Sequence, residues 1–155
     1  MLIDQIFFDD SFIGKGWHDE EKTLSELYGE LSYRWMPSGE FASIEVDIPA
    51  KTNSVIFCSI LSVVDKNILK VLKVKAGNIC CDFCFSDSHP FGLGSLLEIF
   101  VPSSITSINT ITFFVPFSVY PSKADKRALA MAFYELKVQL AAPENINKFL
   151  TVWER

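Results

Sequence analysis

Hydrophobic and polar residues alternate with a period of two along much of this chain. In the segment 41–48, Ile44, Val46 and Ile48 alternate with polar residues, which predicts an antiparallel strand with one face in water. The segment 55–64 is apolar on both faces and predicts a strand in the middle of a sheet. Two further strands are predicted over 96–101 and 110–117, where Pro116 indicates a sheet edge or a strand end.

A β-hairpin is predicted over 73–79. Lysines point outward along 69–75, and the alternation slips between Val71 and Leu72, which indicates a bulge. The residues 76–78 are suited to a tight turn, and the alternation resumes over 79–85 on a returning strand.

Three segments show helical spacing. The pattern over 19–31 is weakly helical, with Leu24 and Leu27 beside acidic residues. The segment 128–140 fits either a helix or a strand, although residue propensities favour helix. The segment 143–153 predicts a short C-terminal helix that begins near Pro143.

The number and spacing of the strands predict an all-β fold. Seven or more short strands without intervening helices indicate an antiparallel two-sheet β-sandwich, with a jelly roll as the preferred form. A length of 155 residues, of which 49% are hydrophobic, suffices for one core. We therefore predict one domain over 1–142, followed by a helical tail over 143–155 that packs on the domain or on a partner.

Charge and hydropathy narrow the possible partners. The net charge is −5 and the basic residues are dispersed, so nucleic acid is not an expected partner. No secretory signal is recognisable in residues 1–10, and the run 55–64 is too short to cross a membrane, so a cytoplasmic protein is expected.

Four cysteines lie in or beside predicted strands. Cys81 and Cys84 have the spacing of a zinc pair, and only His18 and His89 could complete a set of four ligands. The preferred interpretation is that the cysteines are reduced thiols that pack as small hydrophobic residues. We expect neither a metal nor a cofactor.

Candidate binding residues occur in three short segments: 14–18, 34–36 and 125–127. We predict that carbohydrate binds to six residues in these segments, Trp17, His18, Arg34, Trp35, Asp125 and Arg127. Indole rings match the C–H faces of sugars, and charged side chains bind their hydroxyl groups. Structural alternatives remain open, because the tryptophans could cap the core and Asp125 could pair with Arg34 or with Arg127. Asp9 and Asp10 could line a calcium loop or form an acidic turn.

The order of several short motifs resembles a known family. The motifs are Gly16-Trp17-His18, Arg34-Trp35-Met36, the segment 42–49, the hairpin 73–78 and Asp125-Lys126-Arg127 with the apolar run after it. This order resembles the galactose-binding-like β-sandwich domains that accompany bacterial glycosyltransferases of surface-polysaccharide assembly. The resemblance implies that 128–140 is the closing strand and that Arg34 lies near Asp125. The chain departs from the family in a long segment over 19–33 and a short one over 119–124.

These features predict a function that involves binding without catalysis. No nucleophile with an oriented base is recognisable, and Cys84 with His89 is the only Cys–His pair close in sequence. The leading prediction is a non-catalytic carbohydrate-binding or accessory module that acts with a glycosyltransferase. The alternative is a protein–protein interaction domain that docks on a partner enzyme, or forms a homo-oligomer, through the tail.

Overall fold

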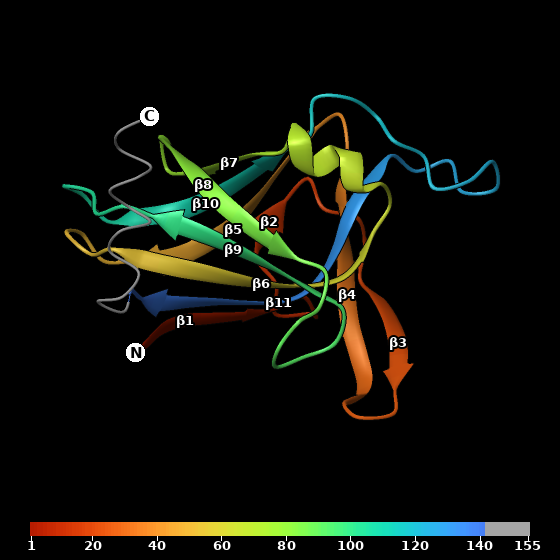
Figure 1. Cartoon of the computed structure of the whole chain (residues 1–155), viewed down its shortest axis with the longest axis horizontal. Coiled ribbons are helices and arrows are strands. Elements are labelled where there is room, and N and C mark those ends of the chain that lie inside the picture. Colours follow the sequence, from red (N-terminus) through yellow and green to blue (C-terminus); the bar gives the residue numbers. More distant parts are fainter. Residues whose placement is uncertain (142–155) are drawn as a thin grey trace.

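A computed structural model describes residues 1–141 as an antiparallel β-sheet that curls into a half-barrel (Figure 1). The all-β class is therefore confirmed. The predicted C-terminal helix lies outside the described residues. The strands are β1 (Leu2–Phe7), β2 (Gly14–Lys15), β3 (Glu21–Ser25), β4 (Gly29–Pro37), β5 (Phe41–Ile48), β6 (Ser54–Val63), β7 (Lys73–Ala76), β8 (Ile79–Ser86), β9 (Ser95–Val101), β10 (Ile108–Phe114) and β11 (Leu129–Leu140).

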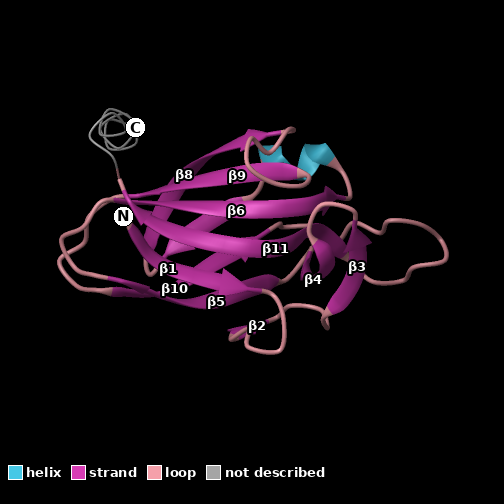
Figure 2. Cartoon of the chain, turned by 90° about the horizontal axis from the view of Figure 1, so that it is seen from below, coloured by secondary structure: helices cyan, strands magenta, loops and turns pink. Residues whose placement is uncertain are grey.

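The strand order is β2-β5-β10-β7-β8-β9-β6-β11-β4-β3, and β1 also pairs with β11. The curl of the sheet brings β1 close to β5, where the backbone N–H of Asp47 donates to the Asp4 carboxylate at 3.1 Å. Figure 2 shows β1 and β5 on the same side of the molecule, with β6 and β9 on the other. The concave side of the sheet encloses the core.

The apolar side chains at the alternating positions fill this core. Ile44, Val46 and Ile48 of β5 are buried in one hydrophobic cluster, as the pattern predicted. The apolar strand β6 lies between β9 and β11, which confirms the prediction of a central strand. Burial of apolar side chains on the concave face is the main force that holds the sheet in its curled form.

The hairpin predicted over 73–79 is also confirmed. β7 pairs with the first part of β8, where Ala76 lies opposite Ile79. The later part of β8, from Asp82 to Ser86, pairs instead with β9. β8 therefore connects the part of the sheet that contains β7 with the part that contains β9.

Two local predictions were wrong. The segment 19–31 is not helical but contributes to the hairpin β3–β4, which projects from the sheet (Figure 1). Leu24 and Leu27 are 85% and 84% exposed, so their helical spacing does not mark a buried face. The irregularity near Val71 is not a bulge but the end of a 3₁₀-helix, η1 (Lys66–Lys70), which buries Ile68.

The ambiguous segment 128–140 is strand β11, in agreement with the resemblance. One edge of β11 pairs with β6, and its other edge pairs first with β4 and then with β1. Residues 129–133 are all buried, which explains why the alternation was hard to recognise in the sequence. Tertiary contacts therefore override the helical propensity of this segment.

The cysteines lie on strands, as predicted. Cys58 of β6 and Cys81 of β8 are buried, and burial raises the pKa of the Cys81 thiol to about 11. Cys80 and Cys84 are exposed, and all four are free thiols. Among residues 1–141, no helix has the length and hydrophobicity that crossing a bilayer requires.

Candidate functional site

Trp17 lies in an aromatic cluster. Its indole packs edge-on against Phe133 at a ring separation of 4.9 Å and also contacts Phe8, Phe12 and Phe113. The indole N–H donates to the carbonyl of Ser43 at 3.0 Å. Both the ring and the polar group of Trp17 are therefore engaged within the protein, which favours the core alternative.

The segment before Trp17 fits closely against β5. Gly16 has a φ of 86°, and a Cβ at this position would lie 2.2 Å from the carbonyl oxygen of Phe41. A side chain here would clash with the neighbouring strand. The glycine of the Gly-Trp-His motif is thus required to position Trp17.

His18 and Arg34 bind backbone groups of neighbouring segments. A ring nitrogen of His18 lies 3.2 Å from the carbonyl oxygen of Ala128, and its backbone N–H donates to the carbonyl of Trp35. The Arg34 guanidinium donates to the carbonyls of Asp9 and His18, and it lies over the ring of Phe12. Trp35 is half-buried on β4. These contacts join the segment between β2 and β3 to β4 and to the start of β11.

Asp125 and Arg127 form an ion-paired network with Glu21. The guanidinium of Arg127 donates to Asp125 at 2.7 and 3.0 Å and to Glu21 at 3.0 Å. The hydrogen bonds from Arg127 lower the pKa of Asp125 to about 2. The resemblance implied that Arg34 lies near Asp125, but the two residues do not form a pair. Arg34 binds backbone carbonyls, and Asp125 binds Arg127. The alternative pairing of Asp125 with Arg127 is the one observed.

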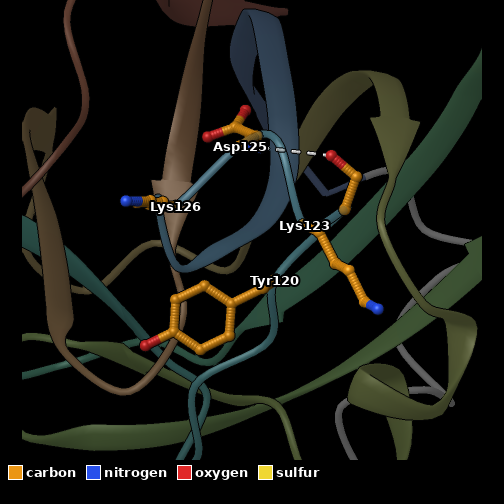
Figure 3. A pocket seen from close by; sticks show the side chains of 5 residues that line it. Tyr120, Lys123, Asp125 and Lys126 are labelled. Atoms are coloured by element: carbon orange, nitrogen blue, oxygen red, sulfur yellow. Dashed lines mark hydrogen bonds between the residues drawn. The ribbon is translucent and has the colours of Figure 1, made fainter.

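A shallow hollow adjoins this network (Figure 3). It is lined by Tyr120, Ser122, Lys123, Asp125 and Lys126. Figure 3 shows the ammonium groups of Lys123 and Lys126 pointing to opposite sides rather than toward a common point. Such an arrangement does not concentrate charge on one ligand.

A deeper groove of about 530 Å³ lies on the outer face of β1, β11, β6 and β9. The loop between β8 and β9 and the end of the β3–β4 hairpin form its walls. Its aromatic residues come from distant parts of the chain: Phe7, Tyr28, Phe57, Phe91 and Tyr134. The volume is within the range of about 300–1,000 Å³ that is usual for ligand sites.

Hydrogen bonds hold the β8–β9 loop against the groove. The backbone N–H of Phe91 donates to Nδ1 of His89 at 3.1 Å, and Nε2 of His89 lies 2.9 Å from the Ser59 hydroxyl. Tyr134 donates to the carbonyl of Leu93 at 2.6 Å. The wall that carries Phe91 is therefore fixed in place without a ligand.

The Ser59–His89 pair is unsuited to nucleophilic catalysis. A backbone N–H can only donate, so Nδ1 of His89 is the acceptor and Nε2 carries the proton in the neutral ring. Nε2 then donates to Ser59 and cannot remove its proton, as a general base must. Ser59 is also 4% exposed, which keeps its hydroxyl away from a ligand.

Charged and amide groups line the floor of the groove. Glu135 forms an ion pair with Lys137 at 3.4 Å and accepts a hydrogen bond from Gln5 at 3.2 Å. Glu98 and Gln139 also line the groove. The floor thus offers both donors and acceptors below the aromatic walls.

We expect the stability of the fold to fall as His89 becomes protonated. Burial lowers the pKa of His89 below 6.5, although nearby Glu135 opposes the shift. The unfolded chain therefore binds a proton at higher pH than the folded one, so stability declines as the pH falls through 6.5 and below. Protonated Nδ1 also cannot accept the N–H of Phe91.

Urea denaturation of wild type and of His89→Gln at several pH values between 7.5 and 5 measures this effect. Wild type should lose more stability than the variant over this range, because glutamine does not titrate. Equal losses in both proteins would contradict the role given to His89.

The comparisons with known proteins identify no relative. No protein-family model, curated protein or solved structure matches this chain. Its function must therefore be inferred from its own residues.

The sequence did not indicate the groove. In the sequence, His89 stands out only as a neighbour of Cys84 or as a possible zinc ligand, and Ser59 lies within an apolar run. No cluster of three metal-ligating side chains occurs in the described residues 1–141. Asp9, a candidate calcium ligand, accepts hydrogen bonds from the backbone and hydroxyl of Ser11 instead.

Proposed function

We propose that this protein is a non-catalytic binding module that takes a saccharide in the groove on the outer face of β1, β11, β6 and β9. The observation that carries the proposal is the gathering of aromatic rings around a polar floor in one concave site. Aromatic faces pack against the C–H groups of a pyranose, and the polar groups of the floor can bind its hydroxyl groups. The proposal moves the site away from Trp17, whose indole packs in the aromatic cluster.

Preorganisation supports this proposal. Phe91 is 89% exposed, yet its loop is tied to the sheet through His89 and Ser59. A loop whose backbone is held in place before the ligand arrives loses little conformational entropy on binding. An exposed ring on a fixed loop is a common property of binding sites.

The resemblance adds a context and a finer description of the fold. The context is action beside a glycosyltransferase in the assembly of bacterial surface polysaccharide. The finer description is a jelly roll of two sheets, in which β8 passes from one sheet to the other. Both belong to the proposal and rest on the order of the sequence motifs.

The test measures glycan binding to wild type and to Phe91→Ala. An oligosaccharide array identifies candidate sugars, and calorimetry with a soluble hit gives the affinity. Removal of the ring should weaken binding about tenfold, since its partial burial contributes about 1.4 kcal/mol.

Phe41→Ala is the matched control, because Phe41 is 64% exposed but stacks on Phe114 outside the groove. It should leave the affinity unchanged. Equal losses in both variants, or no binding of wild type to any glycan, would refute the proposal.

A protein–protein interaction domain is the second candidate. Leu24 and Leu27 at the end of the β3–β4 hairpin are almost fully exposed, and Tyr28 beside them lines the groove. Exposed apolar side chains that cluster on a projecting hairpin favour contact with another protein. Leu24→Ser with Leu27→Ser should then reduce partner binding without affecting glycan binding.

A further inference from the structure

A second apolar cluster lies outside the main core. On β6, Ile56 and Cys58 point into the core, so Val55 and Phe57 point to the outer face of the sheet. On β9, Ile99 likewise points inward, so Phe100 points outward. Val55 lies directly opposite Phe100 in the pairing of the two strands.

These outward side chains are nevertheless buried. Val55 is 1% exposed and Phe100 is 3% exposed. Within residues 1–141, the hydrophobic residues packed against them are Phe57 and Ala141. Such complete burial on an outer face requires a cover on that side of the sheet.

The chain leaves the sheet beside this cluster. The backbone N–H of Ala141 donates to the carbonyl of Asn53 at 3.0 Å, next to the start of β6. The sequence continues for 14 residues, 142–155. These residues therefore begin within reach of Val55 and Phe100.

The sequence of this segment is that of an amphipathic helix. Ile146, Phe149, Leu150 and Trp153 would share one face. Glu144 and Lys148 would fall on the opposite face. A helix over 143–153 would be about 16 Å long. The three strand spacings from β11 through β6 and β9 to β8 amount to about 14 Å, so the lengths match.

We propose that residues 143–153 dock as an amphipathic helix across the outer face of β6 and β9 and cover Val55 and Phe100 with the apolar stripe. The occupant of this surface is the protein's own C-terminal segment. Phe57 borders both the covered cluster and the groove. The docked helix would therefore lie beside the groove.

Fluorine NMR of protein labelled with 5-fluorotryptophan tests the docking. The chain has three tryptophans, and Trp153→Phe assigns the signal of the one in the tail. In the full chain, the Trp153 signal should be protected from a soluble paramagnetic agent and should not change on dilution.

Phe149→Asp should abolish this protection, because it places a charge in the apolar stripe without touching residues 1–141. Asn147→Asp makes the same change of charge beside the stripe and should preserve protection. Phe100→Asp should reproduce the loss from the other side of the contact, provided that its other tryptophan signals show a folded domain.

Three results would overturn the proposal. The first is an exposed Trp153 in the wild-type monomer, and the second is protection that survives Phe149→Asp. The third is protection only at concentrations where sedimentation detects dimers, which would identify a second copy as the occupant.

Discussion

Replacing Trp17 with alanine should lower the free energy of unfolding by about 3 kcal/mol, because it leaves a cavity among packed aromatic rings. The cavity would lie between Phe8, Phe113 and Phe133. Trp17→Phe should cost less, about 1 kcal/mol, since it retains a ring but leaves the Ser43 carbonyl without its donor. Urea denaturation measures both changes.

Tyr120→Ala provides the control for this prediction. Tyr120 is largely exposed, and its replacement should change stability by less than about 0.5 kcal/mol. If Trp17→Ala left stability unchanged but reduced glycan binding, Trp17 would be a surface sugar platform and not a core residue.

Gly94→Ala should destabilise the fold by about 3 kcal/mol and disturb the groove. Gly94 has a φ of 79°, which costs about 1–2 kcal/mol for a residue with a side chain. The new Cβ would also lie 2.2 Å from the carbonyl oxygen of Ile60, and relief of this overlap costs about 1–3 kcal/mol more. Because the Gly94 carbonyl accepts the N–H of His89, the loop that carries Phe91 should also lose its position.

Gly77→Ala separates the two contributions. Gly77 also has a positive φ, of 58°, but nothing lies within 4 Å of the added Cβ. This variant should cost only about 1 kcal/mol and leave glycan binding intact. Equal destabilisation by the two substitutions would show that the close approach of Gly94 to β6 is unimportant.

The fold class could be predicted because each strand carries its own pattern. Ile44, Val46 and Ile48 report their burial through local alternation, whichever strands lie beside β5. The hairpin at Gly77 is equally local, since its turn and both strands are adjacent in sequence. Patterns of this kind require no knowledge of distant residues.

The β3–β4 hairpin could not be predicted in the same way. It projects from the sheet, so Leu24 and Leu27 do not contact the core and their spacing carries no information about burial. The segment 129–133 posed the opposite problem, because burial of every residue removes the alternation. Both difficulties arise where the two faces of a strand have the same environment, and for 128–140 the resemblance, not the local pattern, gave the correct prediction of a strand.

Local sequence patterns could not predict the candidate site, because its residues are far apart in the sequence. Arg127 binds Glu21, which is 106 positions away, and no spacing rule connects them. The groove likewise combines Phe7, Tyr28, Phe91 and Tyr134 through the curl of the sheet. A tryptophan is distinctive in a sequence by its residue type, whereas a phenylalanine in a loop, such as Phe91, is not.

The place of β11 in the sheet has a consequence for biosynthesis. β11 pairs with β1, β4 and β6, yet it is the last of these strands to emerge from the ribosome. Until then, the edges of β1, β4 and β6 that pair with β11 have no partner strand, and long-range strand pairing is slow. A nascent chain arrested before Leu129 would expose these edges to other chains. We therefore expect the domain to complete its folding only after β11 has been translated, although its partner β1 is the first strand to be made.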